Sequence, residues 1–156
     1  MPEKTCLLKE EQIKLWRKYI KPNINDSLSF APDDKLDWAP AEGMMTFGQV
    51  FVHIAETSDW WYDEVMKNNI SVELTSKTIE SKKEIAAHLD AHWNRMDRFF
   101  SEPQEALEKQ YSFKHEDKTF TFSGNWIFTH LLEHDSHHRS QIHQYLRILG
   151  ITPPRV

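Results

Sequence analysis

Histidines are concentrated in the stretch HLLEHDSHHRSQ, residues 130–141, which holds four of the nine histidines of the chain. Neutral imidazole nitrogens are common ligands of transition metals. Two histidines four residues apart on a helix lie on successive turns of one face, so both rings can reach one ion about 2 Å away. His134 and His138 have this spacing. Two ligands do not complete a metal site, however, and the same spacing is typical of ordinary polar helix faces.

The apolar residues around this stretch predict that His134 and His138 face the protein interior. On a helical wheel with about 100° per residue and His130 at 0°, the apolar side chains lie between roughly 60° and 160°. These side chains are Ile127, Leu131, Ile142, Tyr145, Leu146 and Leu149. His134 lies at about 40° and His138 at about 80° on this wheel. His130 and His137 lie toward the edge, and His143, at about 220°, is expected to point to solvent.

Buried imidazole rings need hydrogen-bond partners or a metal, so a third ligand from another helix is expected. His53 lies at one margin of the apolar face of GQVFVHIAETSDWW, with Thr57 and Trp60 on its own side. This is where a helix lines a cleft between neighbouring helices. His92 also approaches the inner face of a predicted helix, and either histidine is equally consistent with a partly buried residue bonded to backbone or carboxylate. The spacing does not choose between His53 and His92.

Four helices are predicted to position these side chains, because apolar periodicity and end signals coincide in four segments. The expected ranges are about Leu8–Leu28, Thr46–Met66, Ser81–Ser101 and a last helix that starts around Ser123 to Asn125 and ends at Gly150. Pro22 is expected to bend the first helix or end it early, and Pro103 to stop the third. Capping-box spacing marks the second and third helices, with Thr46 and Gln49 in one and Ser81 and Glu84 in the other.

Two further segments are predicted between the helices. SFAPDDKLDWAPAEGM, residues 29–44, is a long connection whose apolar Leu36 and Trp38 favour an ordered crossover. Between Tyr111 and Phe122, aromatic and polar residues alternate around HEDK, as in a short β-hairpin.

Composition limits the classes of protein to which the chain can belong. Its 156 residues suit a single domain, and a net charge of −5 without a basic block disfavours binding to nucleic acid or to an anionic membrane. No apolar run approaches the roughly 20 residues of a membrane span, which favours a cytoplasmic protein. Cys6 is the only cysteine, so no internal disulfide is possible, and a role as nucleophile is not expected.

Three motifs in fixed order resemble the DinB superfamily, also described as DinB/YfiT-like, over nearly the whole chain. They are DWAP at 37–40, GMMTFGQVFVHIAETSDWW at 43–61 and HLLEHDSHHRSQIHQYLRILG at 130–150. The resemblance implies an all-α four-helix bundle with a long crossover between helices 1 and 2 and a short β-hairpin before helix 4. It also implies a homodimer and a metal triad of His53, His134 and His138. The family commonly has glycine where this chain has Ser140.

Three imidazoles would leave a coordination position open, as in catalytic sites, and all-nitrogen ligation favours zinc or nickel among divalent transition metals. The resemblance implies a thiol-dependent S-transferase, with a low-molecular-weight thiol as cosubstrate, or a hydrolase acting on a small molecule. Glu56 and Gln141 are the candidate catalytic residues around the ligands. Trp60 and Thr57 are candidates for binding the substrate.

Two other interpretations remain open. The first is a non-catalytic metal-binding stress-response or interaction protein, in which the ion stabilises the folded bundle. The second is a metal-free dimeric bundle whose histidines sense pH.

Asp135, at about 140° on the wheel, is expected to be buried and either to orient a ligand or to pair with an arginine or lysine.

Overall fold

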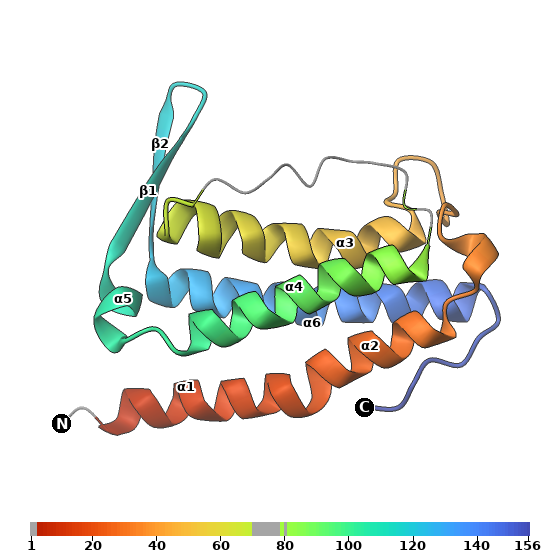
Figure 1. The fold of residues 1–156 in the computed structure, drawn as a ribbon, viewed down its shortest axis with the longest axis horizontal. Coiled ribbons are helices and arrows are strands. Elements are labelled where there is room, and N and C mark those ends of the chain that lie inside the picture. Colours follow the sequence, from red (N-terminus) through yellow and green to blue (C-terminus); the bar gives the residue numbers. More distant parts are fainter. Residues whose placement is uncertain (1–2, 70–78, 80) are drawn as a thin grey trace.

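The computed structural model describes residues 3–69, 79 and 81–156, and most of them are helical (Figure 1). Its architecture is the expected all-α bundle with one small hairpin. The helical elements are α1 (Glu3–Leu15), the π-helical turn η1 (Trp16–Ile20), α2 (Lys21–Phe30), the 3₁₀ turn η2 (Asp33–Lys35), α3 (Phe47–Ser58), its π-helical extension η3 (Asp59–Met66), α4 (Lys82–Phe100), α5 (Gln104–Glu108) and α6 (Gly124–Ile148). The strands are β1 (Gln110–His115) and β2 (Lys118–Ser123).

The bundle is a ring of four helices in which α3 packs against both α4 and α6, and α2 packs against the same two helices. Figure 1 shows α3 and α4 running in one direction and α6 running in the other. Large side chains fill the centre of the ring and are almost inaccessible to solvent. They include Trp16, Phe47, Phe51, Tyr62, Phe99 and Tyr145. Within the described residues, no helix is long and apolar enough to cross a bilayer.

The first helical segment does not end at Pro22, contrary to one of the two expectations, and it continues to Phe30. A π-helical turn ends two residues before the proline, at Ile20, and the Lys21 N–H donates to the Trp16 carbonyl five residues back. Proline lacks an N–H and its ring crowds the carbonyl four residues earlier, so a helix must adjust near it. The wider turn lies where this adjustment is needed.

The start of α3 is held from two sides. Thr46 and Gln49 form the predicted capping box, with the Gln49 N–H 3.2 Å from Thr46 Oγ1 and the Thr46 N–H 2.8 Å from Gln49 Oε1. The long connection is ordered, because the Gly48 N–H donates to the Leu36 carbonyl at 2.8 Å. A β-carbon at Gly48 would lie only 3.0 Å from this carbonyl oxygen, so the close approach favours glycine.

The hairpin forms as predicted and packs against η3. Its register pairs Gln110 with Ser123 and His115 with Lys118, and Glu116 occupies the left-handed region with φ 52° in the turn. The ring centroids of Phe113 and Phe122 lie 5.7 and 5.4 Å from that of Trp61. The contact places the hairpin beside the segment that continues α3. The short helix α5 was not predicted.

Candidate metal centre

Three histidines from two neighbouring helices converge in the bundle. His53 comes from α3, and His134 and His138 come from α6. One ligand nitrogen of each ring lies within 4.8 Å of those of the other two. Nε2 of His53 and Nε2 of His134 lie 3.1 Å apart. Of the two candidates that spacing left open for the third position, the structure places His53 in the cluster.

A chain of hydrogen bonds orients the ring of His138. Tyr145 donates its hydroxyl hydrogen to the carbonyl of Met45 at 2.9 Å, and the Gln141 amide nitrogen lies 3.4 Å from the Tyr145 oxygen. The Gln141 carbonyl oxygen then faces His138 Nδ1 at 2.7 Å. A carbonyl can only accept, so Nδ1 carries the hydrogen and Nε2 keeps its lone pair. Gln141 therefore fixes the tautomer that leaves Nε2 free to bind a metal.

Burial keeps the three imidazoles neutral. The pKa of His134 falls to about 2, because the ring is largely buried and lies beside His138, His53 and His130. Burial likewise lowers the pKa of His53. Burial also lowers the pKa of His138, because it outweighs the opposing effect of the hydrogen bond that His138 donates to Gln141. Neutral imidazoles are the form that binds metals, so protons do not compete strongly for these nitrogens.

The donor set fits a transition metal. Two nitrogens bound to one tetrahedral ion at 2.0–2.1 Å are about 3.3 Å apart, close to the 3.1 Å between His53 and His134. Thr57 Oγ1 lies 3.2 Å from the same Nε2 of His134 and donates to the His53 carbonyl at 2.9 Å. Among the described residues, Nδ1 of His134 is buried without a hydrogen-bond partner, so its tautomer is not fixed as that of His138 is.

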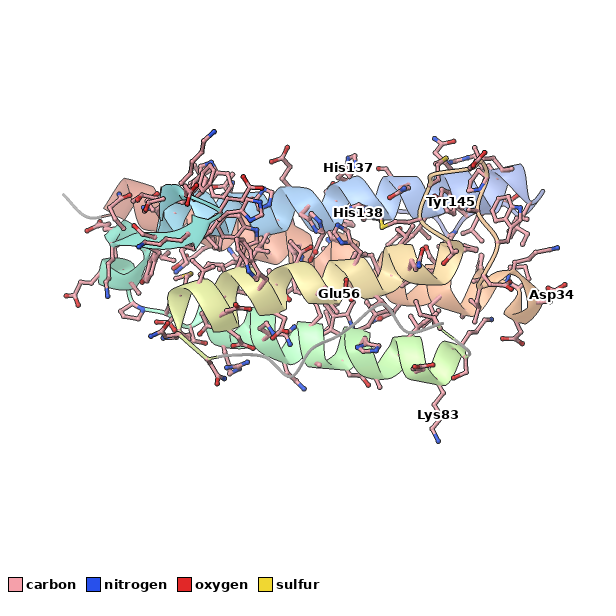
Figure 2. The ribbon with its side chains drawn as sticks, turned by 90° about the horizontal axis from the view of Figure 1, so that it is seen from above. Asp34, Glu56, Lys83, His137, His138 and Tyr145 are labelled. Carbon is pink, nitrogen blue, oxygen red and sulfur yellow. The ribbon has the colours of Figure 1, made fainter. Side chains whose placement is uncertain are left out.

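The cluster opens on one side into a cavity of about 370 Å³. Its wall is formed by His53, Glu56, Thr57, Trp60, Trp61, His130 and His134. Figure 2 shows Glu56 on α3 and His138 on α6, the two helices that carry the cluster. Burial, and secondarily the charge of Asp59, raises the pKa of Glu56. Glu56, Thr57 and Trp60, proposed from the sequence, thus line one cavity with two of the three histidines.

His130 also lines this cavity, although the wheel assigned it only to the edge of α6. Its ring stacks on Trp126 with centroids 4.8 Å apart and contacts Trp61 edge-on at 5.5 Å. Burial lowers its pKa. The signal available in the sequence was its position four residues before His134, which places the two rings on one face.

His92 and Asp135 belong to a separate buried network. His92 is inaccessible to solvent, with Nδ1 2.6 Å from Ser58 Oγ and Nε2 2.9 Å from Asp135 Oδ2. Trp16 donates its indole N–H to the same carboxylate oxygen at 2.8 Å. Both ring nitrogens of His92 are engaged, so His92 is not the third ligand. Asp135 is buried as expected, but it pairs with His92 rather than with an arginine or lysine, and it does not contact the cluster through a hydrogen bond.

Arg95 extends the network across to η3. Its guanidinium donates to Asp63 at 2.8 Å and to Ser58 Oγ at 3.0 Å, and lies 3.3 Å from Asp59. Asp59 and Asp63 are four residues apart in the sequence and both buried. This arginine and its aspartates were not identified from the sequence.

The expectation that His143 faces solvent is wrong. Its side chain is only 8% exposed, because the segment after Gly150 turns back along α6 and covers it. Ser140 is exposed, so serine in place of the family's common glycine does not disturb a close helix contact.

The fold and the site together define a class of protein: a helical bundle in which three histidines converge in a way that is compatible with a transition metal. The DinB family model matches residues 11–156, and the chain therefore belongs to the DinB family. The fold resembles that of a DinB-like protein from Bacillus cereus ATCC 10987, with a TM-score of 0.72, 22% identity, and coverage of 94% of this chain and 96% of that one. The fold also resembles that of a DinB-like protein from Bacillus subtilis, with a TM-score of 0.66, 15% identity, and coverage of 86% of this chain and 90% of that one. No functionally curated protein matches the chain.

Proposed function

We propose that the protein is a metal-dependent enzyme in which His53, His134 and His138 hold a zinc or nickel ion next to a small-molecule substrate. The observation that carries the proposal is that His53 and His134 line a cavity of about 370 Å³. Cavities of this size accommodate small organic molecules. A site that served only to stabilise the bundle would be closed by protein ligands, whereas three histidines beside a cavity leave a position open.

The proposed reaction is transfer of a low-molecular-weight thiol to a small molecule, or hydrolysis of one. A bound transition metal lowers the pKa of water or of a thiol, and both reactions need such a nucleophile. Glu56 supplies a place for the released proton, because it lines the cavity and its pKa is raised by burial toward the working range of a general base.

The aromatic wall supports a substrate with an apolar or planar part. Trp60 is half-buried in this wall, and its ring centroid lies 4.6 Å from those of Trp61 and Phe113. Fixed aromatic rings bind flat apolar groups with little loss of side-chain entropy. Thr57, whose hydroxyl lies 3.2 Å from His134 Nε2, supplies a polar contact in the same wall.

Metal content tests the first part of the proposal. Protein purified without a nickel column is expected to contain stoichiometric zinc or nickel by elemental analysis, and His53→Ala and His134→Ala are expected to remove it. The triad is refuted if the native protein contains no stoichiometric metal and neither variant changes zinc binding.

Catalysis is tested with Glu56→Gln, which keeps the side-chain volume and removes the basic carboxylate. The metal-loaded protein is screened for thiol conjugation to aromatic electrophiles and for aryl ester hydrolysis. Glu56→Gln is expected to lower the rate by about 10²–10⁴-fold with unchanged metal content, whereas Glu133→Gln, on the exposed side of α6, is expected to be neutral. Full metal loading without either activity would instead favour a metal-binding stress-response or interaction protein.

We also propose a homodimer, which the family resemblance implies. Sedimentation velocity of the metal-loaded protein tests it, and a monomer at micromolar concentration would contradict it.

A further inference from the structure

His130 lines the cavity beside the candidate metal centre but is not one of the three converging histidines. Two tryptophans hold its imidazole ring in place. One is Trp126, on which the ring stacks with centroids 4.8 Å apart and planes 15° from parallel. The other is Trp61, which meets the ring in a T-shaped arrangement with centroids 5.5 Å apart. These contacts fix the orientation of the ring, although the side chain is only half-buried.

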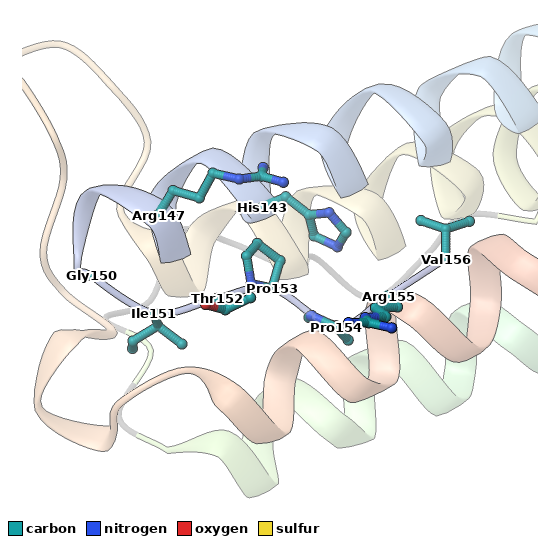
Figure 3. Close-up of a pocket in the computed structure, with 9 residues that line it drawn as sticks. All are labelled: His143, Arg147, Gly150, Ile151, Thr152, Pro153, Pro154, Arg155 and Val156. Carbon is teal, nitrogen blue, oxygen red and sulfur yellow. The ribbon is translucent and has the colours of Figure 1, made fainter.

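Both ring nitrogens of His130 are free to contact a ligand. Among the described residues, neither nitrogen has a hydrogen-bond partner, and neither belongs to the buried polar atoms that lack one. His143 shows the contrary case, because the segment after Gly150 covers its ring (Figure 3) and its Nε2 is buried without a partner. His130 therefore presents an oriented and accessible polar group at a cavity wall, and the protein itself does not use that group.

The wall of this cavity carries no positively charged side chain of the lysine or arginine type. Among its seven residues, Glu56 is the only acidic one. A carboxylate or phosphate on a substrate would therefore find no cationic partner in the wall apart from a bound ion, and it would be repelled by Glu56. An uncharged carbonyl oxygen needs only a hydrogen-bond donor. His130 can supply this donor, because an imidazole ring carries at least one N–H in either protonation state.

We propose that His130 is a substrate-positioning residue that donates its N–H to a carbonyl oxygen of a flat, uncharged substrate. The inference rests on the proposed function, which makes the ligand of this cavity a substrate. His130 precedes His134 by four residues, so it lies about one helical turn, or about 5.4 Å, farther along α6. The hydrogen bond thus selects molecules whose carbonyl oxygen lies on the order of 5 Å from the group at the metal.

The test is titration of the full chain, with and without zinc, with acetophenone and with toluene, followed by the NMR signal of the Trp60 indole N–H. Acetophenone has a flat ring and one carbonyl oxygen, whereas toluene has the ring without an acceptor. Acetophenone is expected to bind with a dissociation constant on the order of 1 mM and more tightly than toluene. Equal binding of the two molecules, or no saturation by acetophenone, would overturn the inference.

Benzoate tests the charge of the substrate, because it is similar in shape to acetophenone but carries a negative charge. The comparison uses the zinc-free chain, since a carboxylate can bind to the ion itself. Benzoate is expected to bind more weakly than acetophenone. Tighter binding of benzoate to the zinc-free chain would refute an uncharged substrate.

His130→Phe separates a hydrogen bond from a structural role, because phenylalanine keeps a flat ring beside Trp126 and Trp61 but has no N–H. The variant is expected to weaken acetophenone binding about two- to tenfold and to leave toluene binding unchanged. His115→Phe, at an exposed position of the hairpin, is expected to affect neither. Unchanged acetophenone binding in His130→Phe, or an equal loss of toluene binding, would show that the ring only shapes the cavity.

Zinc binding by the same samples separates this inference from the proposed function. His130 is not a proposed ligand, so His130→Phe is expected to bind zinc as tightly as the native chain, which also shows that the variant folds. A chain that binds acetophenone through His130 but holds no zinc would refute the metal-dependent function and leave the binding role of His130 intact. A chain that holds zinc but binds acetophenone independently of His130 would refute this inference alone.

Discussion

Replacing Gln141 by leucine tests whether the hydrogen bond to His138 prepares the site for a metal. Leucine has a similar size but accepts no hydrogen bond, so Nδ1 of His138 loses the partner that lies 2.7 Å away. The tautomer with a free Nε2 is then no longer favoured. Loss of a partner that orients a ligand histidine typically weakens metal binding by about 10- to 100-fold. That range corresponds to about 1.4–2.8 kcal/mol, comparable with one hydrogen bond to a charged or polarised group.

The assay is competition for zinc between the metal-free protein and a chelator of known affinity. Tyr145→Phe leaves the hydrogen bond between Gln141 and His138 in place and removes the outer links of the chain, which are the 3.4 Å contact to the Gln141 amide and the 2.9 Å hydrogen bond to the Met45 carbonyl. It is expected to weaken zinc binding by a smaller factor. Gln144→Leu makes the same chemical change at an exposed position of α6 and is expected to have no effect. The reasoning is refuted if Gln141→Leu binds zinc as tightly as the native protein, or if Gln144→Leu is weakened equally.

Three further predictions concern stability. Asp135→Ala leaves two buried N–H donors without an acceptor and is expected to cost about 3–5 kcal/mol in urea unfolding, whereas the exposed Asp90→Ala should be nearly neutral. His134 has a pKa of about 2 in the folded chain against about 6.5 in the unfolded chain, so the unfolded chain takes up the proton first. In the metal-free protein, the contribution of the neutral His134 ring to stability is therefore fully present above about pH 6.5. Below that pH, the free energy of unfolding falls by up to about 1.4 kcal/mol per pH unit. A urea midpoint that does not change between about pH 7.5 and pH 5 would contradict this. Gly124→Ala places a β-carbon 2.4 Å from the Ala106 carbonyl oxygen, and its thermal midpoint should fall by an amount that corresponds to about 1–3 kcal/mol.

The helical wheel succeeded where one uninterrupted helix decides the direction of a side chain. α6 is continuous from Gly124 to Ile148, so the angles placed His134 and His138 on its inner side correctly. The capping box and the hairpin were also predictable, because both depend on residues close together in the sequence.

The wheel failed where a distant segment decides the surroundings. His143 lies on the polar side of α6, yet the tail after Gly150 buries it, and no pattern within α6 contains that information. The same limit applies to His53 and His92, which both lie near inner faces of their helices. Their difference depends on which residues of α6 face them: the ligand histidines for His53, and Asp135 for His92.

The contacts of His92 also separate a catalytic arrangement from a structural one. Ser58, His92 and Asp135 are hydrogen-bonded in the order of a serine nucleophile, its base and the supporting acid, but all three are fully buried. A nucleophile must reach its substrate, and Arg95 already occupies the Ser58 oxygen. Thr57, the residue before Ser58, instead contacts His134 at the cavity. Consecutive residues of α3 thus face a buried network and an open site, and the network, by fixing the position of α3 against α4 and α6, holds His53 within reach of His134.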